Sequence, residues 1–328
     1  MIDLGVIQDA RGRIGGHILS TPTVPSPILS DICRVPVALK LEHHQTTGSF
    51  KIRGATNAIL KLTEAERARG VVAVSTGNHG RALSYAARAV GSSATICMSR
   101  LVPENKVSEI RRLGADVRII GDSQDEAEKE VDRLVDEDGL LLLPPFDHPD
   151  IIAGQGTIGL EILEVMPDVA TVLVPVSGGG LAAGIAAAIK AMRPHVRIIG
   201  VSMQRGAAMK ASLDAGRPVQ VEEVRSFADA LGGGIGLHNK LTFGMCQSLL
   251  DDLLLVTESE IAAGIRHAYE KEGEIVEGAG AVGIAALLAD KIAGLRGPVA
   301  LVLSGRNVDM EMHRRVVNGL SDPLRGDV

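Results

Sequence analysis

Short apolar runs alternate with segments of helical periodicity along most of the chain. The runs at 71–75, 94–98 and 116–120 are predicted to be buried strands, because each is short and bounded by turn residues. A helical pattern follows each of these runs. Strands and helices that alternate in this way are typical of an α/β fold with a parallel, doubly wound sheet.

The alternation restarts after a turn-rich stretch, PPFDHP at 144–149, which is the best candidate for an internal boundary. Beyond it we predict two helices, at 151–167 and 178–194, and strands at 171–177, 197–203 and 298–304. The chain has 328 residues, about twice the length of an ordinary domain, so two lobes are expected.

Composition and charge narrow the possible partners. Aromatic residues make up 2% of the chain and the formal net charge is −6, so we do not expect nucleic-acid binding, which uses basic patches and stacking aromatics. The sequence shows no signal-peptide pattern and no apolar run of bilayer length. Three scattered cysteines (Cys33, Cys97 and Cys246) suggest buried thiols in a reducing compartment. We therefore expect a cytoplasmic protein without a membrane partner.

Two glycine-rich stretches resemble a dinucleotide-binding fingerprint, and neither satisfies it. The stretch 178–183 lies between a predicted strand and a helix, but the acid required about 20 residues later is missing at 200–204, which reads GVSMQ. The stretch 278–283 follows a poor strand. What remains at Ser177–Leu181 is a phosphate cradle at a helix start, with a packing turn as the alternative.

Two further segments are candidates for chemistry. Ser75–Gly80 places hydroxyls, an amide and glycines directly after a buried strand, where it could hold a carboxylate or simply cap a helix. Lys51 lies between Phe50 and Ile52 in a glycine-flanked segment. Burial would lower the pKa of such an amine and suit it to act as a base or to form a Schiff base, although a surface lysine is the commoner case.

Taken together, these segments resemble the serine/threonine dehydratase and serine racemase family, the fold-type II pyridoxal-phosphate enzymes. The motifs that carry the resemblance run in order along the chain and are GSFKIRGA at 48–55, STGNHG at 75–80, AGQGT at 153–157, SGGGL at 177–181 and LSGRNVD at 303–309. The resemblance implies two doubly wound parallel-sheet domains. The larger would comprise 1–51 and 148–320, the smaller 52–147, and 321–328 would be a frayed tail.

The resemblance also implies roles for individual residues. Lys51 would hold pyridoxal phosphate and move the α-proton, Phe50 would pack against its ring, and Asn78 would bond its phenolic oxygen. Ser304 would face the pyridine nitrogen. The remaining residues fall into a phosphate group, Ser177, Gly178, Gly179, Gly180 and Leu181, and a substrate-carboxylate group, Ser75, Thr76, Gly77, Asn78 and His79.

The implied reaction is the dehydration and deamination of a β-hydroxy amino acid to a 2-keto acid and ammonia. A serine at the pyridine nitrogen makes the ring a weaker electron sink, which favours prompt β-elimination. A β-replacement synthase is disfavoured by QTTGSFKIRG around Lys51. A sensor that binds pyridoxal phosphate without turnover is the non-enzyme alternative. Family likeness suggests a homodimer.

Several positions depart from the family pattern. Thr76 stands where racemase relatives carry a serine that acts as the acid on the opposite face of the cofactor ring. Threonine keeps the hydroxyl, so racemisation is conceivable, with helix capping as the alternative. The stretch 202–208 lacks the carboxylates of the racemase cation site, so no metal is predicted there. His43 and His44 could line the substrate entrance or form a solvated pair. Glu277 could lie near the cofactor ring or cap a helix.

Arg306 is the residue that indicates which substrate the protein uses. It replaces a small residue of the relatives and could bind a second polar group of an unusual substrate, or could pair at the surface with Asp309 or Glu311. With the stretches at 41–59 and 200–213, it makes the chain resemble the hydroxyectoine-utilisation dehydratases within the family. That likeness implies a substrate such as 3-hydroxy-2,4-diaminobutyrate. A generalist threonine/serine dehydratase or a serine racemase remains the alternative.

Overall fold

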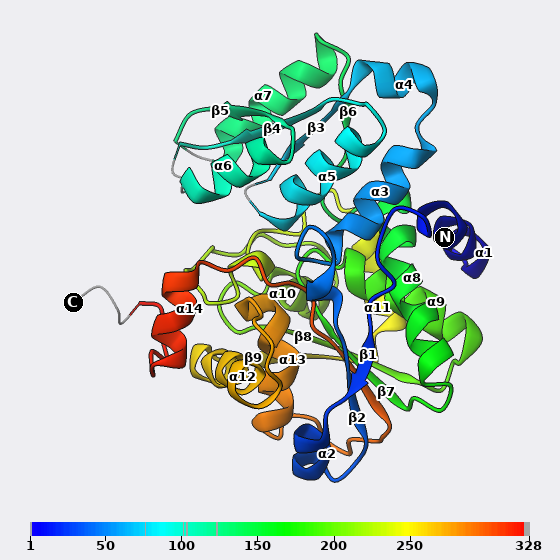
Figure 1. Cartoon of the computed structure of the whole chain (residues 1–328), viewed down its shortest axis with the longest axis vertical. Coiled ribbons are helices and arrows are strands. Elements are labelled where there is room, and N and C mark those ends of the chain that lie inside the picture. Colours follow the sequence, from blue (N-terminus) through cyan, green and yellow to red (C-terminus); the bar gives the residue numbers. More distant parts are fainter. Residues whose placement is uncertain (1, 76, 101, 103, 123, 325–328) are drawn as a thin grey trace.

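The computed structural model describes residues 2–75, 77–100, 102, 104–122 and 124–324. Two sheets organise the chain, and Figure 1 shows the smaller one with its helices as a separate lobe above the larger. The elements outside the two sheets are α1 (Leu4–Ile14), α2 (Pro27–Cys33), η1 (Glu42–His44), α3 (Lys51–Lys61), α4 (Glu64–Arg69), α5 (Asn78–Ala89), α6 (Glu104–Arg112), α7 (Gln124–Asp136), α8 (Pro149–Val165), α9 (Gly180–Met192), α10 (Ala208–Ala215), η2 (Asp229–Leu231), α11 (Thr242–Leu249), α12 (Glu258–Lys271), α13 (Gly278–Leu288) and α14 (Met310–Val317).

The large sheet has six strands in the order β1–β2–β10–β7–β8–β9. All neighbours pair in parallel except β1 and β2, which are antiparallel at the edge. One apolar cluster joins one face of the sheet to α1, α8, α9 and α11, and a second joins the other face to α2, α12, α13 and α14. The strands are β1 (Thr23–Pro25), β2 (Val37–Lys40), β10 (Val299–Val302), β7 (Thr171–Pro175), β8 (Arg197–Met203) and β9 (Asp252–Val256).

The small sheet has four parallel strands in the order β5–β4–β3–β6. Helices α3, α5 and α6 pack on one face, while α7 covers the other. The strands are β3 (Val71–Val74), β4 (Ala94–Met98), β5 (Asp116–Ile119) and β6 (Leu141–Leu142). Both sheets are covered by helices on their two faces, so the predicted doubly wound α/β fold is confirmed.

Helix α8 lies between α3 and α9, and glycines allow the close contact. A Cβ on Gly154 would lie 2.6 Å from the carbonyl oxygen of Arg53, and one on Gly184 would lie 2.4 Å from that of Ile152. The AGQGT motif therefore has a packing role, because larger side chains would push these helices apart. Among the helices of the described part, none combines the length and apolarity that crossing a membrane requires.

Candidate active site

A cavity of about 230 Å³ lies between the two sheets. Its wall comes from segments that follow β3, β7 and β10, together with the first residues of α3 and α13. The carboxyl ends of parallel strands meet there, which is where open α/β sheets bind ligands. Among the residues in the wall are Phe50, Lys51, Ser75, Gly77, Asn78, His79, Ser177, Gly178, Gly179, Gly180, Leu181, Glu277, Ser304 and Asn307.

Lys51 is the first residue of α3, and its side chain reaches the cavity wall. The backbone N–H of Phe50 donates to the carbonyl oxygen of Ser304 at 3.0 Å, which ties the start of α3 to the end of β10. The Lys51 ammonium donates to the carbonyl oxygen of Pro145 at 2.7 Å and lies 5.3 Å from the centre of the Phe50 ring. Burial lowers the pKa of Lys51 to about 8, so a useful fraction of the amine is neutral near that pH.

The glycine triplet forms a tight turn at the start of α9. Gly179 is the residue before the helix and has φ +89°, and a Cβ there would lie 2.7 Å from the Met209 side chain. A Cβ on Gly178 would lie 2.3 Å from the Phe146 ring. The first turn of α9, described in full, contains no acidic residue. Unpaired N–H groups at a helix start and the helix dipole favour an anion at this point.

Lys51 and the glycine turn thus lie in the wall of one cavity. A phosphorylated aldehyde needs an amine with which its aldehyde group can form a Schiff base. It also needs an anion site close enough to that amine for its phosphate to reach. The site provides a desolvated amine and a turn at which a Cβ would fill the space beside the helix start. These residues fit pyridoxal phosphate.

The predicted carboxylate loop lies at the start of α5. The Ser75 hydroxyl accepts from the backbone N–H of Gly80 at 2.8 Å, which shapes the loop. The Nε2–H of His79 donates to the carbonyl oxygen of Leu143 at 2.8 Å. Burial, with a smaller contribution from Lys51, lowers the pKa of His79 to about 3, so its ring is neutral. Thr76, the candidate racemisation acid, lies outside the described residues.

Asn78 is fixed by two side chains of the cavity. Its amide nitrogen donates to Glu277 Oε1 at 2.7 Å, and its amide oxygen accepts from Asn307 Nδ2 at 2.5 Å. Burial, with a contribution from Asp229, raises the pKa of Glu277 to about 7. The Glu277 side chain makes no capping bond to α13, so the capping alternative for this residue is wrong. Asn307 lies in the LSGRNVD motif at 303–309, but the sequence predicts no role for it.

The structure places Ser304 in the cavity wall but leaves Arg306 outside it. Ser304 is buried and lies in the cavity wall at the end of β10. Arg306 is exposed and is not among the described residues that line the cavity. Its backbone N–H donates to the carbonyl oxygen of Gly48 at 2.9 Å, and the next residue, Asn307, faces the cavity instead. The structure therefore does not place Arg306 with the other predicted substrate residues.

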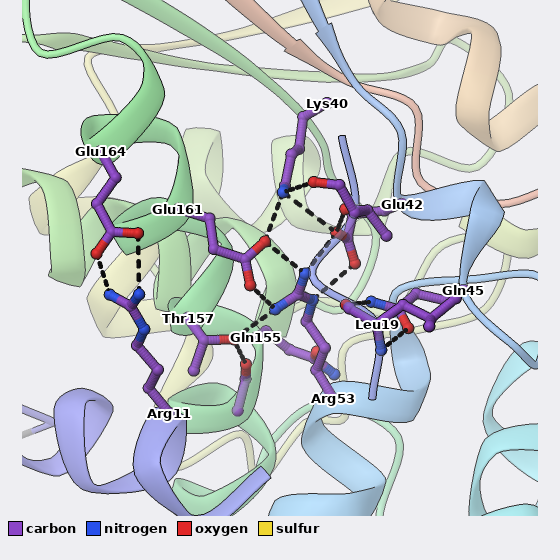
Figure 2. Close-up of polar contacts among 12 residues, drawn as sticks. Arg11, Leu19, Lys40, Glu42, Gln45, Arg53, Gln155, Thr157, Glu161 and Glu164 are labelled. Carbon is purple, nitrogen blue, oxygen red and sulfur yellow. Dashed lines mark hydrogen bonds and ion pairs between the residues drawn. The ribbon is translucent and has the colours of Figure 1, made fainter. Parts of the chain in front are cut away.

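A buried ion network supports the start of α3 and was also missed from the sequence (Figure 2). Arg53 donates to both oxygens of Glu42 at 2.8 Å and to both oxygens of Glu161 at 2.7 and 2.8 Å. Lys40 also bonds Glu161. Burial alone would raise the pKa of Glu42, but Arg53 outweighs it and holds that pKa below its usual value. Two cations and two anions therefore balance one another inside the protein.

Comparisons with known proteins identify the family. A family model described as pyridoxal-phosphate dependent enzyme matches residues 14–305. A Sinorhizobium fredii protein provisionally named a threonine dehydratase is 68% identical over 97% of this chain and 96% of its own. The L-threonine ammonia-lyase of Thermotoga maritima is 43% identical over 97% of this chain and 79% of its own.

Solved structures of the same family have a similar fold. Maize serine racemase superposes with a TM-score of 0.91 at 32% identity, and the match covers 96% of this chain and 97% of that one. The chain therefore belongs to the fold-type II family of pyridoxal-phosphate dependent serine and threonine dehydratases, and it is a lyase of the ammonia-releasing class.

Proposed function

We propose that the protein converts a β-hydroxy amino acid into a 2-keto acid and ammonia, with Lys51 as its catalytic base. The observation that carries the proposal is the position of the Lys51 amine, with its pKa lowered to about 8, in the same cavity as the glycine turn of α9. When bound, pyridoxal phosphate supplies an electron-withdrawing ring that stabilises the charge left on the α-carbon.

The chain's own residues then have separate tasks. The N–H groups at Gly178–Leu181 would hold the phosphate, Phe50 would pack against the ring, and Ser304 would face the pyridine nitrogen. The loop at 75–79 would hold the substrate carboxylate, Thr76 would be the candidate acid for racemisation, and Asn78 would bond the phenolic oxygen. Lys51 Nζ would accept the α-proton, and the β-hydroxyl would leave when its bond to the β-carbon breaks and its oxygen takes up a proton, so that the lost α-proton and hydroxyl together make up one water. A second water hydrolyses the released enamine, so the net products are a 2-keto acid and ammonia.

The substrate is either threonine or serine, or a hydroxylated diaminobutyrate of the kind used in hydroxyectoine breakdown. The relatives named threonine dehydratase and L-threonine ammonia-lyase support the first candidate. The carboxyl of Glu277 in the cavity wall supports the second, because a second ammonium group would favour its ionised form, whereas Asp229 in the same wall already pairs with Lys106. Arg306, which the sequence offered as support for an unusual substrate, is exposed.

A keto-acid assay on the purified holoenzyme tests both candidates. L-threonine, L-serine, 3-hydroxyaspartate and 3-hydroxy-2,4-diaminobutyrate are compared by kcat/KM, with chiral analysis of the remaining substrate to detect racemisation. We expect 2-keto acid and ammonia in equal amounts from at least one substrate. Absence of turnover on all four, with cofactor bound, would favour the sensor alternative.

We also propose the assembly, location and domain limits that family likeness suggests. The protein would be a cytoplasmic homodimer, and its three free thiols support a reducing compartment. The large domain would comprise 1–51 and 148–320 and the small domain 52–147; the separate sheets support this division. The proposed tail at 321–328 is described only to 324, and within it Asp322 pairs with Arg205 at 2.9 Å. Sedimentation analysis of the holoenzyme tests the dimer.

A further inference from the structure

Two histidines and one glutamate from segments far apart in the sequence meet at one point of the structure. His43 Nε2 and His44 Nε2 each lie 2.8 Å from the same atom, Glu274 Oε2. The histidines belong to η1, and Glu274 lies between α12 and α13. None of the three is among the described residues that line the cavity.

The chemistry of the cluster is that of a metal site. Two imidazole nitrogens and one carboxylate oxygen, all within 4.8 Å of one another, form a ligand set that zinc-class ions prefer over magnesium or calcium. A tetrahedral ion with bonds of about 2.0–2.1 Å needs ligand atoms roughly 3.3 Å apart, so the contacts of 2.8 Å would open only slightly.

Access to the cluster differs from one ligand to another. The side chain of His43 is 1% exposed, whereas those of His44 and Glu274 are 37% and 19% exposed. An ion can therefore arrive from the solvent side, and water can complete its coordination there.

The second nitrogen of His43 provides an independent observation. His43 Nδ1 is buried and has no hydrogen-bond partner among the described residues. When both Nε2 atoms donate to Glu274, this Nδ1 is a bare acceptor in an apolar place, which is costly. A metal on Nε2 would move the proton to Nδ1 and so remove the bare acceptor.

We propose that His43, His44 and Glu274 bind one divalent transition-metal ion of the zinc class. The ion would link the segment that leads to Lys51 with the segment that leads to Glu277, two residues of the cavity wall. The sequence predicts no metal at 202–208, where carboxylates are missing, and it gives no sign of this cluster, because Glu274 lies 230 residues from His44 and only the fold brings them together. The site is independent of the proposed reaction.

Zinc titration of the tag-free holoenzyme, after treatment with a chelator, tests the proposal. Calorimetry should show one Zn²⁺ per chain, and Co²⁺ should give the visible absorbance of a site with nitrogen and oxygen ligands. Mg²⁺ should not compete. Substitutions His44→Ala and Glu274→Gln should each weaken the Kd for Zn²⁺ at least tenfold, which is about 1.4 kcal/mol.

His195→Ala is the matched control, because His195 is exposed and lies in the loop between α9 and β8. This variant should bind Zn²⁺ as the wild type does. Circular dichroism of all variants in EDTA separates loss of binding from loss of fold. The proposal is overturned if the wild type takes up no Zn²⁺, or if the His44 and Glu274 variants bind it as tightly as the control.

Discussion

At the scale of single residues, the site holds ionisable groups away from their ordinary protonation states. Burial favours the uncharged form of Lys51 and of Glu277, with pKa values of about 8 and about 7. Near neutral pH both groups exchange protons readily, which is the condition that general acid–base chemistry requires. His79 is the opposite case, because a pKa of about 3 leaves it neutral throughout that range.

The raised pKa of Glu277 makes stability depend on pH. Between the ordinary pKa of 4.5 and the folded value of about 7, the folded state binds more protons than the unfolded state, so this residue lowers stability as pH rises. Glu277→Gln removes that dependence and should stabilise the cofactor-free protein at pH 8 by up to about 3 kcal/mol, but not at pH 4.5. Urea unfolding at several pH values measures the effect. Parallel pH curves for wild type and variant would contradict it.

Alanine should be tolerated less well at Gly179 than at Gly91, although both glycines have a positive φ. Gly179→Ala imposes both a left-handed backbone at φ +89° and an overlap with Met209, whereas Gly91→Ala imposes only φ +72° in open space. Gly91→Ala should cost about 1–2 kcal/mol of stability. Gly179→Ala should cost more and should also weaken pyridoxal-phosphate binding, measured by fluorescence titration. If the two variants weakened pyridoxal-phosphate binding equally, the glycine turn at 178–180 would not be the phosphate site.

At the scale of elements, the ion network of Arg53 joins β2, η1, α3 and α8 (Figure 2). Arg53→Met would leave Glu42 and Glu161 buried with Lys40 as their remaining cation, and should cost about 3–5 kcal/mol in urea unfolding. Arg314→Met is the control, because Arg314 and Glu311 form an exposed pair, and it should leave the urea unfolding curve nearly unchanged. A small loss for Arg53→Met would mean that the network does not support α3.

Local pattern predicted six of the ten strands that the structure describes, and it missed β1, β2, β6 and β9, of which β9 is as long as β4 and β7. The strands now labelled β3, β4, β5, β7, β8 and β10 follow from apolar runs bounded by turns. The strands β1 and β6 have three and two residues, too few for a period to show. The motifs around Lys51 and Gly178–Gly180 were recognised from the sequence, but the residues that they contact were not. Lys51 bonds Pro145 and Gly178 lies against Phe146, and both of these partners belong to the stretch that the sequence predicts to be a domain boundary.

At the scale of the whole molecule, the cavity exists only because the two lobes meet (Figure 1). Lys106 on α6 pairs with Asp229 on η2 at 3.1 Å, and both line the cavity from opposite lobes. Asn78, Glu277 and Asn307 come together from α5, the start of α13 and the segment after β10. Such contacts depend on tertiary packing, so a motif can name Asn78 but cannot name the residues that orient it.

The central claim is that Lys51 carries pyridoxal phosphate, and borohydride trapping followed by peptide mass spectrometry tests it most directly. Reduction of the holoenzyme should fix the cofactor to the peptide that contains Lys51. The control Lys61→Ala changes a half-exposed lysine at the other end of the same helix, and it should trap normally. Lys51→Ala should trap no cofactor and should lose keto-acid formation. Cofactor fixed to a different lysine, or full turnover by Lys51→Ala, would contradict the account.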